Sequence, residues 1–301
     1  MRRSHAVLIL IFAAAIWGFA FLFQKTAMNH VGPIQFVAAR SVVGCLALLP
    51  LALHEMRKGG VGWRSVQRVA LPAGAAFFIA AILQQVGLVS ATVTNTGFLT
   101  ALYVVITPLL TWALLSRRPT PLIWLAVGCS FVGTWLLGGG SLAAFSSGDR
   151  LVAASAVFWA LHIVLVGRAG VLERPIAFTT LQFATIACLA AIATPFVETV
   201  SLSKLAGAWL EIAYVGILSS AVTFTLFTIA VRHTGPSEAT IIVSTETLFA
   251  AFGAWLVLGE RLPVIGWLGA GLIFAATLLV QLAPIARQAE PGGPLPDKKS
   301  A

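Results

Sequence analysis

The sequence predicts an all-α integral membrane protein with ten transmembrane helices, arranged as two inverted five-helix repeats with both termini in the cytoplasm. Three observations predict this fold class: ten long apolar segments, the distribution of positive charge among the loops, and a similarity between the two halves of the chain. Of the 301 residues, 59% are hydrophobic and only 10% are charged. Soluble domains carry about 25% charged residues, so the composition excludes an ordinary soluble domain.

Ten apolar segments are separated by charged residues, glycine or proline. A segment of about 20 residues, rising 1.5 Å per residue, crosses a hydrocarbon core of roughly 30 Å as a helix. A lone strand would leave backbone groups without hydrogen bonds in lipid, and the alternation typical of a barrel strand is absent. The segments are 6–24, 34–53, 69–88, 93–115, 122–137, 151–166, 177–197, 208–231, 239–258 and 264–282.

The positive charges are unevenly distributed between the two sets of loops. The chain has 19 Lys and Arg against 10 Asp and Glu, a net charge of +9. Such an excess on an apolar chain is typical of cytoplasmic loops rather than of nucleic-acid binding. With the N-terminus in the cytoplasm, Arg40 falls within a span and only four cations fall outside the cell: Lys25, Arg150, Lys204 and Arg261. This asymmetry predicts that both termini are cytoplasmic and that the number of spans is even.

The two halves of the chain match at an offset of 142 to 143 residues. Because five spans per half is an odd number, the second half must enter the membrane from the opposite side, as in many secondary transporters. We expect a first repeat over 6–138, a second over 149–283, and a disordered cytoplasmic tail over 284–301. The matched positions include Trp17 with Trp159, Pro33 with Pro175, and Trp124 with Trp267.

Several short motifs follow one another along the ten segments. They are Trp17-Gly18 with Lys25 at the end of the first segment, Pro33 followed by Arg40, the run 96–108, and Glu246 followed by Gly259-Glu260. In this order and spacing they resemble the EamA family of the drug/metabolite transporter superfamily, over residues 6–282. The resemblance implies a permease of the bacterial inner membrane that exports amino acids or other small metabolites.

Two positions depart from the pattern of the EamA family. Thr247 stands where the family often has proline after the glutamate, which predicts a weaker helix kink at Glu246. The first half has Ser116-Arg117 at the position of Gly259-Glu260, so this motif carries over only to the second half.

Ionisable side chains inside the spans are the first candidates for a site, because a charge at the bilayer centre costs at least about 2.5 kcal/mol. Glu246 is a candidate for proton coupling or for binding a substrate ammonium, or a structural carboxyl bonded to neighbouring helices. Arg40 is a candidate to bind a substrate carboxylate, or it extends to the outer interface or has a structural role. His162 is a candidate for proton coupling, or a hydrogen-bonded packing residue.

Polar and aromatic side chains inside the spans complete the predicted substrate-binding set. Trp17 and Trp159 occupy matched positions in the two halves and are candidates to form aromatic walls for an amphipathic substrate. The polar members either contact substrate or only bridge helices, each bridge contributing about 0.6 kcal/mol. They are Gln84, Gln85, Asn95, Tyr103, Gln182 and Ser244.

These features predict a secondary-active or facilitative transporter that exports small polar metabolites by alternating access. An intramembrane enzyme acting on lipids and a membrane scaffold or receptor are the alternatives. The sequence has no Walker lysine motif, no His-Glu-x-x-His and no Gly-x-Ser-x-Gly, which excludes the corresponding ATPase, zinc protease and esterase chemistry. We expect no catalytic residue, metal or cofactor. The expected partners are a small-molecule substrate and membrane lipid, without nucleic acid, and the sequence leaves monomer or homodimer open.

Overall fold

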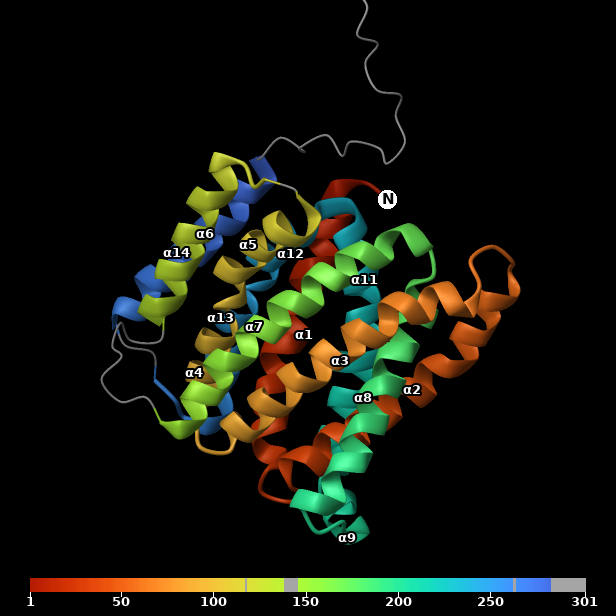
Figure 1. The fold of residues 1–301 in the computed structure, drawn as a ribbon. Helices are drawn as coiled ribbons and strands as arrows, with labels where there is room; N and C mark the ends of the chain where they lie inside the picture. Colours follow the sequence, from red (N-terminus) through yellow and green to blue (C-terminus); the bar gives the residue numbers. More distant parts are fainter. Residues whose placement is uncertain (117, 138–145, 262–263, 283–301) are drawn as a thin grey trace, which may run out of the picture.

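Figure 1 shows the fold in a computed structural model that describes residues 1–116, 118–137, 146–261 and 264–282. Over these ranges the regular secondary structure is helical throughout. The first half contains α1 (Arg3–Ala27), α2 (Pro33–Arg57), α3 (Trp63–Leu88), α4 (Val93–Thr100), α5 (Tyr103–Leu115) and α6 (Pro121–Leu137). The second half contains α7 (Ser147–Ala169), the 3-10 helix η1 (Gly170–Leu172), α8 (Pro175–Val197), α9 (Leu202–Gly207), α10 (Trp209–Ala213), the π-helix η2 (Tyr214–Val222), α11 (Thr223–Thr234), α12 (Pro236–Val243), α13 (Glu246–Leu258) and α14 (Val264–Leu282).

Eight helical segments in the described ranges are long and apolar enough to cross a membrane. Two of them are the pairs α4–α5 and α12–α13, and a third runs from α10 through η2 to α11. Two shorter apolar helices, Pro121–Leu137 and Val264–Leu279, lie side by side at one edge of the bundle (Figure 1). These findings confirm an all-helical protein with multiple apolar helices. The tail expected over 284–301 lies outside the described residues.

Local sequence signals determine where several helices begin. The first residues of α2, α8 and α12 are Pro33, Pro175 and Pro236. Proline suits this position because its φ is already helical and its missing N–H would have no partner within the helix. At the start of α7, Ser146 and Asp149 form a reciprocal capping box. These signals place the helix starts within a few residues of the predicted apolar segments.

Helices α2 and α8 lie side by side and are antiparallel (Figure 1). Glu55, in the last turn of α2, accepts hydrogen bonds from two backbone N–H groups at the start of α8, with 2.8 Å to that of Ala177. Glu198, directly after α8, accepts two from the start of α2, with 2.8 Å to that of Ile34. Each carboxylate therefore caps the other helix, and the matched helices of the two halves run in opposite directions.

Two of the long helices are interrupted at matched positions. The pairs α4–α5 and α12–α13 each contain a helix of 8 residues followed by one of 13 residues. At the second break, the hydroxyls of Ser244 and Thr245 donate to the carbonyls of Ile241 and Ile242, at 2.7 Å in each case. Hydroxyl groups that bond back in this way bend helices. The helix is interrupted here although Thr247 stands where the family often has proline, and the weaker kink stays a prediction.

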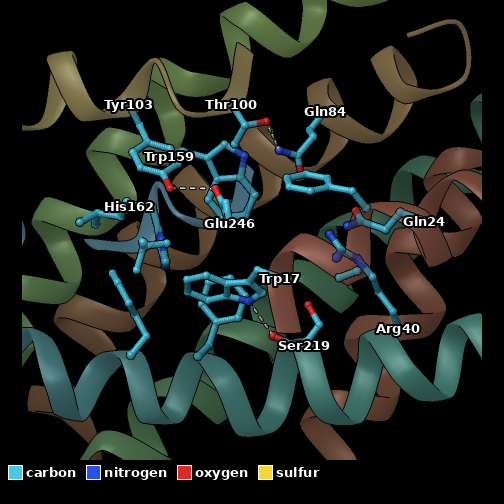
Figure 2. Close-up of a pocket in the computed structure, with 16 residues that line it drawn as sticks. Trp17, Gln24, Arg40, Gln84, Thr100, Tyr103, Trp159, His162, Ser219 and Glu246 are labelled. Carbon is cyan, nitrogen blue, oxygen red and sulfur yellow. Dashed lines mark hydrogen bonds between the residues drawn. The ribbon is translucent and has the colours of Figure 1, made fainter. Parts of the chain in front are cut away.

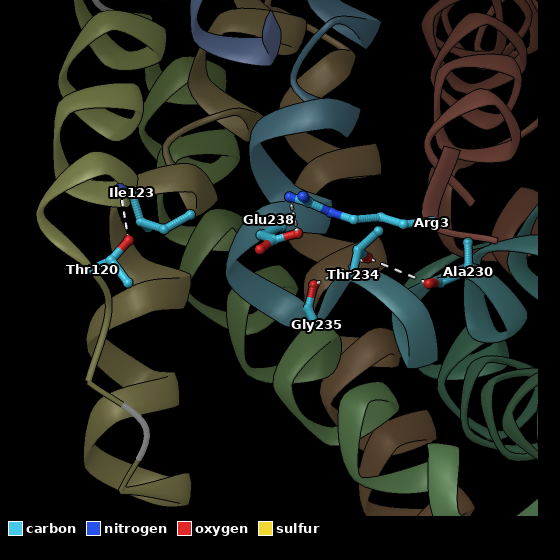
Figure 3. Close-up of polar contacts among 7 residues, drawn as sticks. All are labelled: Arg3, Thr120, Ile123, Ala230, Thr234, Gly235 and Glu238. Carbon is cyan, nitrogen blue, oxygen red and sulfur yellow. Dashed lines mark hydrogen bonds and ion pairs between the residues drawn. The ribbon is translucent and has the colours of Figure 1, made fainter. Parts of the chain in front are cut away.

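Polar contacts join helices at both ends of the bundle. At the end that carries the N-terminus, Arg3 Nη2 lies 2.9 Å from Glu238 Oε2 and joins α1 to the first turn of α12 (Figure 3). We call this end the N-terminal face. At the opposite face, the Lys25 ammonium donates to three carbonyl groups just at and after the end of α3, with 2.8 Å to that of Leu88. The two ends of α1 are thus attached to different halves of the chain.

A close approach between α1 and α13 positions the centre of the bundle. Gly18 lies against the backbone of Glu246, and a Cβ atom at Gly18 would meet the Glu246 carbonyl oxygen at 2.5 Å and the Ala250 nitrogen at 2.8 Å. Only glycine permits this distance between the two helices. The contact brings Trp17 and Glu246, which belong to different halves, to one region of the bundle.

Candidate functional site

A cavity that opens to solvent lies between helices of both halves, and its empty space, open solvent included, measures about 540 Å³ (Figure 2). The lining side chains come from α1, α2, α3, α4, α5 and α7, and from η2, α11, α12 and α13. They are Trp17, Ala20, Phe21, Gln24, Arg40, Gln84, Thr100, Tyr103, Trp159, His162, Ile163, Ser219, Phe224, Phe227, Val243 and Glu246.

The Glu246 carboxyl faces this cavity and accepts a hydrogen bond from the Tyr103 hydroxyl, with 2.7 Å between the two oxygens. Both side chains are buried, with exposed fractions of 4% and 3%. Each residue is the first of the helix that follows a break, Tyr103 in α5 and Glu246 in α13. The first turn of a helix favours a carboxylate through the helix dipole. The interrupted helices thus place an acidic group inside the bundle.

Arg40 lies on α2 and faces the same cavity (Figure 2). It is 5% exposed, and its guanidinium carbon lies 6.0 Å from the centre of the Phe36 ring. Within the described ranges, Arg40 forms no ion pair, and its buried Nε has no hydrogen-bond partner. Arg40 therefore does not extend to the outer interface, which corrects that alternative. A buried guanidinium without a carboxylate is costly, which is typical of a site for an anionic group.

Aromatic rings cover much of the remaining wall of the cavity. The Trp17 ring centre lies 4.6 Å from that of Phe224 and 5.3 Å from that of Phe227. The Trp159 ring lies 6.2 Å from Phe224 and nearly parallel to it, at 19°. Trp17 and Trp159, the matched tryptophans of the two halves, therefore line one cavity (Figure 2). Their rings present a broad apolar surface to whatever occupies it.

The π-helix η2 provides the hydrogen-bond partner of Trp17. The indole Nε1 donates to the Ser219 carbonyl at 3.0 Å. In a π-helix the backbone bonds run between residues five apart, and such segments frequently occur at functional sites. The Thr223 hydroxyl donates to the Leu218 carbonyl, also five residues away, at 2.6 Å. The irregular backbone therefore fixes the orientation of one aromatic wall.

His162 lines the cavity with its ring against the ring of Phe77, at 4.9 Å between centres. Its Nε2 lies 2.6 Å from Gln182 Oε1, which does not line the cavity. No atom in the described part of the chain bonds to His162 Nδ1. Gln182 thus orients the His162 ring, and the second ring nitrogen, Nδ1, is buried without a partner among the described residues.

Two amide side chains lie near Arg40 in the cavity (Figure 2). Gln84 Nε2 donates to the Thr100 hydroxyl at 2.8 Å, which joins α3 to α4. The Oε1 atom of Gln24 is buried and accepts no hydrogen bond from any residue that the structure describes. Buried polar atoms normally have partners, so Gln24 and Arg40 present unused hydrogen-bonding capacity to a ligand.

Seven of the predicted substrate-binding residues line the cavity, and four do not. Those in the cavity are Trp17, Arg40, Gln84, Tyr103, Trp159, His162 and Glu246. The other four contact neighbouring side chains or backbone. Gln182 contacts His162, Gln85 contacts the Gln24 carbonyl, Asn95 contacts Asp149, and Ser244 contacts the Ser130 hydroxyl.

The model of the EamA-like transporter family matches this chain twice, over residues 4–139 and 146–282. The chain belongs to the EamA-like transporter family. The two matches together cover most of the sequence, and the apolar helices agree with a membrane protein of this family. The chain is thus a member of a family of transporters, with two copies of the family model.

Comparisons with individual proteins agree with this EamA-like assignment. An uncharacterized transporter of Archaeoglobus fulgidus is 31% identical over 179 residues, which is 58% of this chain and 53% of that protein. The chain therefore spans about half the length of this relative. A crystal structure of another protein superposes with a TM-score of 0.75, over 94% of this chain and 98% of the other, at 18% identity. At this identity the superposition supports the fold alone.

Gln24, Thr100 and Ser219 line the cavity of this EamA-like transporter but are not among the residues predicted from the sequence. A signal for Gln24 exists, because it lies seven residues after Trp17 and therefore on the same face of α1. Ser219 depends on the π-helix, which no sequence pattern in this chain predicted. The cavity thus combines residues that helix spacing can identify with residues that require the backbone.

Proposed function

We propose that this chain exports small polar metabolites, amino acids among them, across the bacterial inner membrane by alternating access. The observation that carries the proposal is one cavity lined both by the Arg40 guanidinium and by the Glu246 carboxyl, which form no ion pair with each other in the described structure. A zwitterion between these groups would satisfy both charges. Arginine suits a substrate carboxylate, and a carboxylate suits a substrate ammonium.

The proposed topology has ten spans and both termini in the cytoplasm. The eight long helical segments supply eight spans, and the shorter α6 and α14 are proposed as the fifth and tenth. A helix of 17 residues, such as α6, extends about 26 Å, close to the thickness of the hydrocarbon core. We propose residues 6–138 and 149–283 as the two inverted repeats. The antiparallel packing of α2 and α8 supports this arrangement.

Flux measurements in proteoliposomes test this function directly. The purified chain is reconstituted, and counterflow is measured with radiolabelled amino acids, nucleobases and sugars. We expect saturable flux of at least one amino acid. A folded, reconstituted chain that moves no solute of the panel, or that turns over lipid instead, would overturn the proposal.

The coupling of transport to protons is tested through Glu246, with His162 as the second candidate. We propose that the Glu246 carboxyl carries the coupled proton, and in Glu246→Gln the amide cannot do so. We expect flux by this variant to lose its dependence on an imposed pH gradient. Glu173→Gln is the matched control, because Glu173 is an exposed carboxylate that pairs with Arg232 away from the cavity. Full gradient dependence in Glu246→Gln would show that this residue is not the coupling group.

A further inference from the structure

The hydrogen bond between Tyr103 and Glu246 joins two positions that correspond between the two halves. The interrupted spans of the two halves match at an offset of 143 residues throughout. Helices α4 and α12 begin at Val93 and Pro236, and α5 and α13 begin at Tyr103 and Glu246. The residues after α5 and α13, Ser116 and Gly259, both have a left-handed backbone. Tyr103 and Glu246 are therefore the same structural position, occupied by two different residues.

This correspondence has a geometric consequence for an inverted pair of halves. In alternating access by inverted repeats, each half adopts the conformation that the other half had in the opposite state. A contact between residue i of the first half and residue j of the second is then replaced by the contact between their counterparts. A contact between two counterparts is replaced by itself. The Tyr103–Glu246 bond is of this second kind.

The contact of Glu260 at one face of the bundle is of the first kind. The Glu260 carboxylate caps the start of α4, with 2.6 Å to the Thr94 hydroxyl. At the offset of 143, the counterpart of Glu260 is Arg117, and a cation cannot cap the N-terminus of a helix. The contact of Glu260 with α4 therefore has no chemical equivalent at the other face. The contact of Glu260 with α4 is therefore not replaced by an equivalent contact in the opposite state, whereas the Tyr103–Glu246 bond does not need to break.

We infer that Tyr103 is a positioning residue that holds the Glu246 carboxyl in the cavity in both access states. This inference rests on the proposed alternating-access function. The Tyr103 hydroxyl bonds to Oε1 of Glu246, so Oε2 is left for a substrate ammonium. Because both residues begin a helix after a break, the bond also joins α5 to α13 at the level of the cavity. The acidic group would then meet substrate in the same geometry from either side of the membrane.

Transport kinetics of Tyr103→Phe, Glu246→Gln and the double variant test the role of Tyr103. The phenylalanine variant removes only a hydroxyl, so the fold is expected to persist. We expect KM for the transported amino acid to rise roughly tenfold or more in Tyr103→Phe, with a smaller change in the maximal rate. In the Glu246→Gln background the same replacement is expected to have little further effect on KM. An equal rise of KM in both backgrounds would overturn the inference, because Tyr103 would then act independently of Glu246.

Distances between spin labels test whether the bond is present in both states. Labels at the exposed residues Lys58 and Glu173 report one face, and labels at Ser90 and Ser203 report the other, in a background without Cys45, Cys129 and Cys188. We expect Tyr103→Phe to leave the populations of the distance distributions unchanged. A shift toward one state would show that the bond stabilises the other state only and would overturn the inference. Failure of the proposed function is a separate outcome, since wild-type chain would then move no solute.

Discussion

Glu55, near the end of α2, caps the first turn of α8, and Glu198, directly after α8, caps the first turn of α2. The two caps lie at opposite ends of the 25-residue helix α2, which is about 37 Å long. One pair of helices is therefore held at both faces of the bundle by the same chemistry.

We expect Glu55→Gln and Glu198→Gln each to lower the free energy of unfolding by about 1 to 2 kcal/mol. Each carboxylate accepts two backbone N–H groups, and an amide directs a donor at one of them. The measurement is thermal or denaturant unfolding followed by tryptophan fluorescence. Because the two sites are far apart, the double variant is expected to show the sum of the single effects. The exposed Glu173→Gln serves as the control, and an equal loss there would refute a specific role for the caps.

Ser116 and Gly259 offer a test of backbone strain at matched positions. Ser116 has φ 53° and Gly259 has φ 69°, both in the left-handed region that costs a residue with a Cβ about 1 to 2 kcal/mol. Ser116→Gly is expected to raise the free energy of unfolding and Gly259→Ser to lower it, each by about 0.5 to 1 kcal/mol after the entropy of the unfolded chain is included, as measured by thermal unfolding. A Cβ atom at Gly259 would meet no described atom within 4 Å, so crowding does not contribute. A fall in both variants would contradict this explanation.

Gly18→Ala tests the close contact of α1 with α13. A methyl group there would overlap the backbone of Glu246, so we expect a loss of about 1 to 3 kcal/mol in unfolding free energy together with reduced flux. Gly128→Ala in α6 is the matched control, because a Cβ atom there meets no described atom within 4 Å. Unchanged stability in Gly18→Ala would mean that α1 and α13 are farther apart than described.

Arg40→Met separates the effect of the buried guanidinium on stability from its effect on transport. Removing a buried guanidinium that lacks a carboxylate partner is expected to raise the melting temperature. Transport of amino acids is expected to fall, with KM raised roughly tenfold or more through loss of a charged hydrogen bond. Flux assays and thermal unfolding of the same preparation give both values. Lower stability with unchanged KM would assign Arg40 a structural role instead.

The sequence predicted the helical segments well because hydrophobic length is a property of each segment alone. The predicted segment 93–115 and the observed span Val93–Leu115 coincide, although the interruption at Ala101 and Leu102 was not predicted. At the break before Glu246 the hydroxyls of Ser244 and Thr245 compete for backbone carbonyls, whereas the matched break at Ala101 and Leu102 has no side-chain hydroxyl. Such competition depends on side-chain rotamers, which apolar periodicity does not report.

The cavity was predictable where a residue stood out against an apolar background. Arg40, His162 and Glu246 are ionisable residues within spans, and all three line the cavity. Gln84 and Gln85 are adjacent in sequence, yet only Gln84 lines the cavity, and Gln85 bonds to the backbone of α1. Which of two neighbouring amides faces inward depends on how the helices are rotated, and this follows from packing between distant segments.

The π-helix η2 also determines the rotational phase of everything that follows it up to Thr234. A π-helical turn holds one residue more than an α-helical turn, and each residue of an α-helix turns the chain by about 100°. Conversion of Tyr214–Val222 to a regular α-helix with the same residues would therefore rotate Phe224 and Phe227 away from Trp17 without altering either side chain. The chemical character of the cavity wall thus depends on the backbone geometry of a segment most of whose residues do not line the cavity.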